Sequence, residues 1–530
     1  MTALMATTGL ALTGCTTVGP DYHGAPLVAA DAIQASRFAR APADANAVTA
    51  ANTGTGTTST STSTSTSTST STSTSTSTAT AAAAAAAAAA VTANANANAN
   101  TTSLISPTRP TTAAWWLQLH DNTLTALIDQ ALANSPTLQA AQARLRQSRA
   151  ALRLQEAQHM PKGSASALGA GIWQGPGTSS DTTLHLYNVG FDATWEADLF
   201  GGTRRATEAA SAQAEAVQSD LADAQVSLTA EVAQAYADLR AQQRRQALLQ
   251  STAAYDAQTL ALIRQRQERG VSGADDVEQR VLQGESTRAS LADVAAQISA
   301  SLDQLALLTG QAPGALDAQL AASEPSLPTL PESVAIGDPA SLLQRRPDIR
   351  AAERRLAAGQ AKIGQKEANY FPKLTLLGDI GMASTDLGHW LSSKSLALVG
   401  VPYLSWNVLD FGRIRAEVRQ AEAGRDEAVA NYQATVLGAL QDANTSLSRF
   451  GQQRQTLTHL LAQQASAERS LALARQRRQA GTASQLDLLD AQRNQALAAL
   501  KTLDGQAALL KDFVALQKSL GLGWQVLAPS

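Results

Sequence analysis

The second half of this sequence repeats the first half at a constant spacing. Residues that shape the backbone recur 211 positions later, as Pro136 and Pro347 do (347 − 136 = 211). Because Pro, Gly and Trp punctuate secondary structure, this register predicts that the two halves share one backbone plan. The other matched pairs are Arg144 and Arg355, Pro161 and Pro372, Trp195 and Trp406, Phe200 and Phe411, Gly201 and Gly412, Gly270 and Gly481, Asp276 and Asp487, and Gly310 and Gly521.

Each half contains one stretch that predicts a very long helix. Thr203 to Arg269 has neither Gly nor Pro and is rich in Ala, Gln, Glu and Arg. At 1.5 Å per residue such a helix extends roughly 100 Å. Its apolar residues recur every three or four positions and predict one narrow buried stripe. They are Val217, Leu221, Ala224, Leu228, Val232, Ala235 and Leu239. A cytosolic coiled coil is the simpler interpretation, but strand-like segments interrupt the helices.

Two pairs of segments alternate in hydropathy as strands do. In one of them Tyr187, Val189 and Phe191 fall on one face, whereas Asn188 and Asp192 fall on the other. Such segments have the length of tilted membrane strands, with one face for lipid and one for water. Four strands cannot close a lumen, so a cyclic oligomer is expected. The segments are Gly163 to Trp173, Thr183 to Trp195, Lys373 to Met382 and Leu396 to Trp406.

Composition and motifs argue against two other classes of protein. Lys and Arg number 41 against 44 Asp and Glu, which is not the basic excess that nucleic-acid binding requires. The His residues form no HExxH or HxH cluster, and no GxSxG elbow or P-loop is present, so neither an enzyme nor a cofactor or metal site is expected. Gly169-Ala-Gly171 resembles the beginning of a glycine loop, but it lies in a predicted strand without a following helix. It is therefore interpreted as strand packing. The six His residues are His23, His120, His159, His185, His389 and His459.

The first 114 residues predict a leader and a tether. Cys15, the only cysteine, ends an apolar run that resembles a secretory signal followed by a lipid-attachment cysteine. The alternative is an ordinary thiol near a chain end. Residues 1–14 are the expected signal peptide, although Met1 to Thr8 lacks Lys and Arg, so the start is expected to lie upstream. Residues 15–114 include Ser-Thr, Ala and Ala-Asn tracts that cannot form a core.

Several stretches of this sequence resemble the TolC-like outer membrane efflux factors, in particular the NodT-type lipoproteins. The resemblance covers everything outside the tether and includes the region after Cys15. It implies two efflux repeats, 115–330 and 331–530, in a mainly helical fold with a small β part. The matching stretches are Cys15-Thr-Thr-Val18-Gly19-Pro20-Asp21-Tyr22, Trp195-Glu-Ala-Asp198-Leu-Phe200-Gly201, Leu343-Gln-Arg345-Arg346-Pro347-Asp348-Ile349, Tyr370-Phe371-Pro372 and Leu520-Gly521-Leu-Gly523-Trp524.

The resemblance also implies an assembly and its partners. Three chains would each give four strands to a twelve-stranded transmembrane β-barrel, and their long antiparallel helices would form a periplasmic α-barrel. Such a homotrimer would sit in the outer membrane, anchored in its lipid through Cys15, with a large periplasmic portion. A periplasmic adaptor protein and an inner-membrane efflux pump would supply the substrate and the energy. The alternative function is a non-conducting coiled-coil lipoprotein that spaces the layers of the cell envelope.

The resemblance places the working residues at the turns between long helices. Gly270, Ser272, Asp276, Gly481 and Ser484 would form the tip turns that contact the adaptor, although Gly, Ser and Asp are also ordinary helix caps. Asp487 and Asp490 match the family's periplasmic gate, where threefold symmetry makes rings of carboxylates that repel one another. As exposed acids on a helix they would need no such role. Ala483 replaces a basic residue of some relatives, which argues against a latching salt bridge there.

Overall fold

The computed structural model describes residues 17–35, 37–41, 105–106, 114–172, 184–321, 325–331, 333–385, 388 and 392–524. Cys15 and the low-complexity tracts lie outside these residues. The chain forms two compact units, and both are discontinuous in sequence. The first comprises Met1–Val28, Thr137–Ala224 and Arg346–Gly438, and the second comprises Ala29–Pro136, Gln225–Arg345 and Ala439–Ser530.

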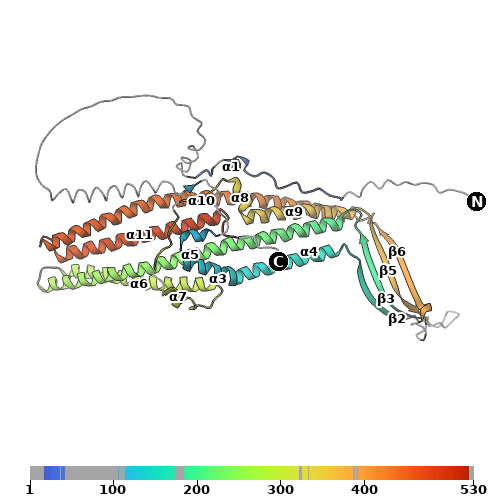
Figure 1. Ribbon diagram of the computed structural model, residues 1–530, viewed down its shortest axis with the longest axis horizontal. Coiled ribbons are helices and arrows are strands. Elements are labelled where there is room, and N and C mark those ends of the chain that lie inside the picture. Colours follow the sequence, from blue (N-terminus) through green and yellow to red (C-terminus); the bar gives the residue numbers. More distant parts are fainter. Residues whose placement is uncertain are drawn as a thin grey trace, which may run out of the picture. The chain divides into compact units, whose positions relative to one another are not determined.

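The first unit contains a four-stranded antiparallel sheet in the order β2-β3-β5-β6 (Figure 1). Each strand begins and ends within two residues of its predicted bounds. The sheet consists of two hairpins, β2 with β3 and β5 with β6. The pairing of β3 with β5 joins them. They are β2 (Lys162–Ile172), β3 (Leu184–Ala197), β5 (Lys373–Ser384) and β6 (Leu396–Ser405).

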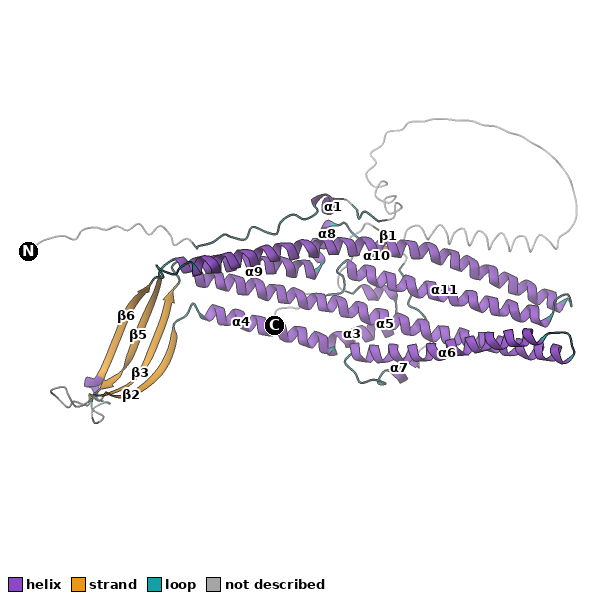
Figure 2. Cartoon of the chain, turned by 180° about the vertical axis from the view of Figure 1, so that it is seen from behind, coloured by secondary structure: helices purple, strands orange, loops and turns teal. Residues whose placement is uncertain are grey.

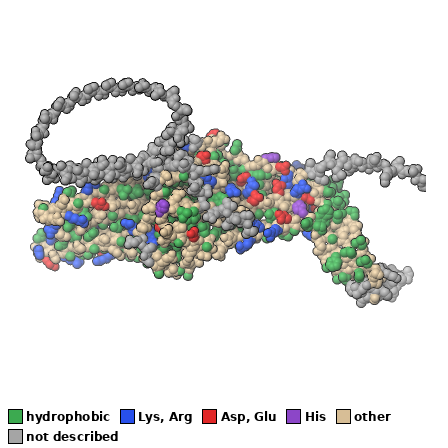
Figure 3. All heavy atoms as spheres, viewed as in Figure 1, with side chains coloured by type: hydrophobic (Ala, Val, Ile, Leu, Met, Phe, Trp, Pro, Cys, Tyr) green, Lys and Arg blue, Asp and Glu red, His purple; other side chains and the backbone are tan. Residues whose placement is uncertain are grey.

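The two faces of this sheet differ in polarity. Phe191, Ile380 and Leu398 lie opposite one another on neighbouring strands and are 69%, 50% and 80% exposed. On the other face Asp192 lies opposite Asp379. Figure 3 shows hydrophobic side chains gathered over the strands, whereas most charged side chains visible in that view lie over the helices. The predicted alternation is therefore confirmed for β3, whereas β6 exposes apolar side chains on both faces, as Leu398 and Val399 show.

The helices of the first unit run side by side from the ends of the strands (Figure 2). They are α4 (Pro136–Ala157), the first part of α5 (Gly202–Glu268), α9 (Pro347–Glu367) and the first part of α10 (Arg413–Gln479). Two equivalent bonds join strand ends to helix ends: the Trp195 indole donates to the His159 carbonyl and the Trp406 indole to the Tyr370 carbonyl, both at 2.9 Å. A short 3-10 helix, η4 (Ala368–Tyr370), follows α9, and η5 (Ser393–Ser395) precedes β6.

The second unit pairs the remaining part of each long helix with a shorter partner. The later part of α5 turns back into α6 (Ala274–Leu308), and the later part of α10 turns back into α11 (Gln485–Ser519). Its core includes the rings of Trp115, Phe450 and Phe513, which pack edge-to-face or tilted at 5.9 and 6.3 Å. The smaller elements are α1 (Ala30–Gln34), η3 (Trp115–Leu119), α3 (Asn122–Asn134), α7 (Asp317–Ala321), α8 (Ala340–Arg345) and the parallel pair β1 (Ile105–Ser106) and β4 (Val334–Ala335).

The long helices of the two halves have equal lengths. Both α5 and α10 have 67 residues and begin 211 positions apart (413 − 202 = 211). Both α6 and α11 have 35 residues and begin at the same spacing (485 − 274 = 211). The stripe predicted on α5 is buried at Leu221, Leu228 and Val232, but burial there is wider than one narrow stripe, because Thr229, Ala230 and Ala233 are buried as well. Of the helices described, none combines the length and the apolar character that a membrane crossing needs.

Candidate functional site

The segment that follows Cys15 is held on the first unit by one buried guanidinium. Arg205 of α5, whose side chain is only 5% exposed, donates to the carbonyls of Val18 and Gly19 and forms an ion pair with Asp21 at 2.6 Å. The hydrogen bond and charge of Arg205 lower the pKa of the Asp21 carboxyl. The Val18 amide also donates to the Phe200 carbonyl at 3.1 Å. Residues 17–21 are therefore anchored beside the start of α5.

Tyr22 extends this attachment onto α9. Its hydroxyl donates to Glu353 at 3.4 Å, and the guanidinium of Arg354 lies 5.7 Å from its ring centroid. Burial raises the pKa of the Tyr22 phenol to about 12, and the nearby Glu353 carboxylate contributes to the rise. The neutral phenol is thus the form that fits this contact.

The first tip turn lies between α5 and α6 and is closed by backbone bonds. Gly270 has a φ of 72°, and the Val271 amide donates to the Arg266 carbonyl at 2.8 Å, as in a Schellman ending. α6 then begins with Gly273 at its N-cap, so Ser272 lies in the turn and is not the cap. Asp276 accepts a bond from the Gly273 amide at 3.3 Å. Gly270 and Asp276 therefore shape the turn.

The second tip turn, between α10 and α11, has a fuller cap. Gly481 has a φ of 73°, and the Thr482 amide donates to the Arg477 carbonyl at 2.9 Å. Ser484 and Asp487 form a capping box: the Asp487 amide donates to the Ser484 hydroxyl, and the Ser484 amide donates to the Asp487 carboxylate. Bonds from the amide and then the hydroxyl of Ser484 lower the pKa of Asp487. The exposed Asp487 carboxylate is thus committed to its own helix.

Asp490, one turn further along α11, contacts α6. The Arg280 guanidinium lies 3.4 Å from the Asp490 carboxylate, with the two side chains 28% and 45% exposed. Arg280 also donates to Gln283 at 3.3 Å. The structure therefore gives Asp490 a basic partner on another helix. The sequence had argued against a salt bridge only at Ala483, which is a different position in the preceding turn. The sequence contained no local signal for this pair, because the two residues lie 210 positions apart.

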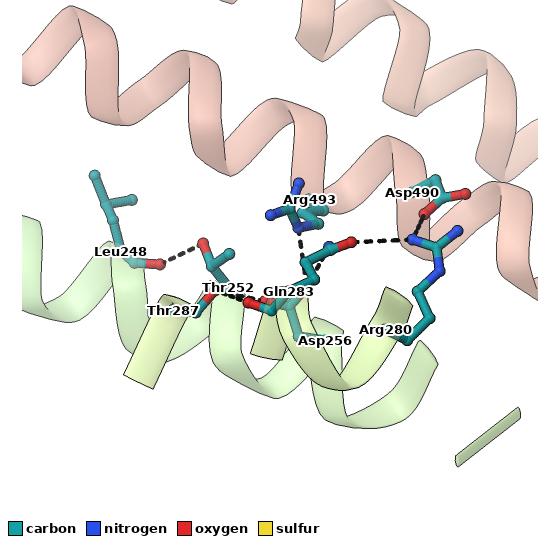
Figure 4. Close-up of polar contacts among 8 residues, drawn as sticks. All are labelled: Leu248, Thr252, Asp256, Arg280, Gln283, Thr287, Asp490 and Arg493. Carbon is teal, nitrogen blue, oxygen red and sulfur yellow. Dashed lines mark hydrogen bonds and ion pairs between the residues drawn. The ribbon is translucent and has the colours of Figure 1, made fainter. Parts of the chain in front are cut away.

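A buried carboxylate connects three helices of the second unit (Figure 4). Asp256 of α5, with a side chain 3% exposed, accepts bonds from Gln283 and Thr287 of α6 at 2.7 Å each. Arg493 of α11 reaches the same carboxylate through its Nε at 2.9 Å. The sequence does carry a signal, because Asp256 lies seven positions from both Leu249 and Ile263, which place it on an apolar helix face that the structure buries. An acidic residue on such a stripe requires partners that come from other helices.

Among the residues described, no three His, Cys, Asp or Glu side chains are grouped to hold a metal ion. The predicted site residues other than Cys15 thus lie in two turns, or in the helix starts that follow them, at one end of the second unit (Figure 1), and Asp490 lies next to the buried contacts of Asp256. Cys15 lies outside the described residues. The arrangement provides capped turns and ion pairs between helices.

The comparisons with known proteins point to one family. The model for the family described as outer membrane efflux protein matches residues 127–311 and 339–522. Outer membrane protein OprJ of Pseudomonas aeruginosa is 32% identical over 417 residues, which are 78% of this chain and 87% of OprJ. The solvent efflux pump outer membrane protein SrpC of Pseudomonas putida is 30% identical over 77% of this chain and 86% of SrpC. The structure of the outer-membrane channel OprN is similar with a TM-score of 0.72 and 34% identity, covering 80% of this chain and 96% of that one.

Proposed function

The chain belongs to the outer membrane efflux protein family, and from this premise we propose that three copies assemble into its working form. It is the outer-membrane channel subunit of a tripartite efflux system and not an enzyme. A periplasmic adaptor and an inner-membrane pump are its partners, and it conducts small molecules passively to the exterior. The observation that carries this function is the family match to both halves of the chain.

The sheet supports the trimer. It has one apolar face exposed, one face with Asp192 and Asp379, and two edge strands that each pair on one side only in the part of the chain that is described. An open apolar sheet of four strands is not stable in water, whereas closure of three such sheets removes every edge. The trimer thus has a twelve-stranded transmembrane barrel with the apolar face toward lipid. The equal lengths and spacing of the helices support an internal two-fold repeat that gives each copy two similar segments of the periplasmic wall.

Reconstitution tests this function directly. Purified protein in a planar bilayer is expected to give discrete conductance steps, and its mass in detergent is expected to equal three chains. A folded trimer that conducts nothing, even after Arg280 and Asp490 are both replaced by Ala, would instead support the non-conducting spacer.

The gate is assigned to Asp487 and Asp490 in different roles. Asp490 forms the ion pair with Arg280 and restrains α11 against α6, while Asp487 holds the start of α11 in place. Threefold symmetry brings three copies of each carboxylate around the axis, and their repulsion favours separation once the restraint is released. The adaptor therefore opens the channel by breaking weak pairs between helices.

The adaptor contacts the two tip turns, formed by Gly270, Ser272, Asp276, Gly481 and Ser484. The exposed first turn of α6 carries Asp275 and Asp276. Asp276→Lys is expected to abolish crosslinking to the adaptor, whereas Asp276→Asn, which keeps an oxygen for the Gly273 amide, is expected to preserve it. If both variants crosslink as the wild type does, the docking assignment is wrong.

The lipid anchor is assigned to Cys15. Cys15 lies two positions before Thr17 in the sequence, and two residues of extended chain span at most about 7 Å. The anchoring of residues 17–21 beside the start of α5 supports an attachment point near that end of the helix. Mass spectrometry of the protein is expected to show acyl chains that are absent from Cys15→Ser, and an unmodified wild-type Cys15 would contradict the assignment.

A further inference from the structure

The pairing between the two halves inside one chain has a simple numerical form. In the β3–β5 pair, opposed residue numbers add to 571, as for Phe191 with Ile380. In the hairpins the sums are 356 for β2–β3 and 778 for β5–β6, as for Lys162 with Thr194 and Lys373 with Ser405. The difference, 422, is twice 211, so the two hairpins have the same register when one is shifted by the repeat.

The two open edges of the sheet lie on β2 and β6. By the repeat these strands correspond to β5 and β3, the two strands that pair inside the chain. Shifting β3 by 211 gives β6, and shifting β5 back by 211 gives β2, so the sum of 571 is unchanged. We propose that β6 of one copy pairs antiparallel with β2 of the next in this register, with Tyr403 opposite Leu168 of the partner subunit. This inference rests on the proposed trimer and specifies its interface.

The polarity of the sheet agrees with this register. An odd sum places Leu404 opposite Ala167 of the partner subunit on the apolar face and Ser405 opposite Ser166 of the partner subunit on the polar face. A sum that differed by one would put the face of Phe191 and Leu398 in one copy on the same side as the face of Asp192 and Asp379 in the next, because successive residues point to opposite sides. Only registers whose sum differs from 571 by an even number remain as competitors.

One aromatic contact, next to the end of β3 and the start of β5, can also be shifted by the 211-residue repeat. Phe200 stacks on Phe371 with ring centroids 4.7 Å apart and planes 18° apart. Shifted by the repeat, this contact joins Phe411 to Met160 of the partner subunit. Phe411 is 98% exposed with a φ of 52°, and Met160 is 67% exposed. A non-Gly residue in that conformation is strained, and a Met sulfur packs well on an aromatic ring. The next copy therefore covers Phe411.

The glycines of β3 and β5 mark a further departure from equivalence. A Cβ at Gly381 would lie 2.6 Å from the Cα of Gly190, so these strands are unusually close there. The corresponding pair between copies is Val401 with Ala170 of the partner subunit. Because both carry a Cβ, the strands between copies must lie at ordinary spacing at that point.

Cysteine crosslinking in outer-membrane vesicles tests the register. Leu168→Cys with Tyr403→Cys, whose numbers add to 571, is expected to give disulfide-linked dimers and trimers after mild oxidation. Ala170→Cys with Tyr403→Cys and Ser166→Cys with Tyr403→Cys keep the same face but add to 573 and 569. They are expected to crosslink at least tenfold less. The single variants, which retain Cys15, measure the background.

The outcomes separate the register from the assembly. Preferential crosslinking of a control pair in a protein that still has the mass of three chains would overturn the register and leave the trimer intact. A protein with the mass of one chain that forms no crosslink between copies would overturn the proposed assembly itself. Met160→Cys with Phe411→Cys is expected to crosslink between copies in the same assay, and a trimer in which this pair does not crosslink would overturn the contact at Phe411.

Discussion

At the scale of single residues, replacement of Asp256 is expected to destabilise the fold. Its buried carboxylate is satisfied by Gln283, Thr287 and Arg493 together. Asp256→Ala leaves their donors without an acceptor, and removal of one member of a buried charged pair costs about 3–5 kcal/mol. We expect the thermal unfolding midpoint of the purified protein to fall by several degrees, measured by circular dichroism in detergent.

Glu285→Ala provides the matched control for Asp256→Ala. Glu285 also pairs with an arginine, Arg288, but both side chains are more than half exposed. Exposed pairs contribute about 1 kcal/mol or less, so the midpoint of this variant should stay close to that of the wild type. Equal losses in the two variants would show that burial of Asp256 has no special weight.

Tyr22 has a pH dependence that can be measured directly. Its folded pKa of about 12 lies above the ordinary value of 10, so the neutral phenol stabilises the attachment of the N-terminal segment. That contribution is complete below pH 10 and is lost as the pH rises through 12. The difference in phenolate absorbance between wild type and Tyr22→Phe is expected to titrate near pH 12. Titration near pH 10 would mean that Tyr22 is not held on α9.

At the scale of elements, the glycine of a tip turn and a glycine inside a helix should respond oppositely to alanine. Gly481 has a φ of 73°, so Gly481→Ala forces a left-handed alanine at a cost of about 1–2 kcal/mol. Gly424 lies inside α10 with open space around it, so Gly424→Ala should gain up to about 1 kcal/mol. Thermal midpoints that shift in opposite directions would confirm the turn, and parallel shifts would contradict it.

The capping box of α11 should weaken in acid. The lowered pKa of Asp487 means that its carboxylate stabilises the folded state above pH 3.8, and that this contribution is lost as the pH falls through the folded pKa. We expect the loss of stability between pH 5 and 2.5, measured by denaturant titration, to be smaller in Asp487→Asn than in wild type. A cap that does not depend on the charge would make the two profiles parallel. Ser484→Ala should cost about 1 kcal/mol at neutral pH.

At the scale of the whole molecule, the ion pair between α6 and α11 should influence conductance. Asp490→Asn and Arg280→Gln remove the charge from either end of the pair and are expected to raise the conductance of the resting channel severalfold in planar bilayers. Arg245→Gln, which breaks the exposed pair with Asp504, serves as the control and should leave conductance unchanged. If all three variants conduct as the wild type does, the Arg280–Asp490 pair does not restrain the gate.

The sequence by itself determined the elements and the family. Helix periodicity, the absence of Gly and Pro over residues 203–269 and the alternation in the strands act over a few residues, so α5 and all four strands were predicted to within two residues. Only the tertiary structure decided which side chains meet. Asp256 binds partners 27, 31 and 237 positions away, and Asp490 binds Arg280 from 210 positions away. Such contacts depend on how helices turn and pack, and no local pattern encodes that geometry.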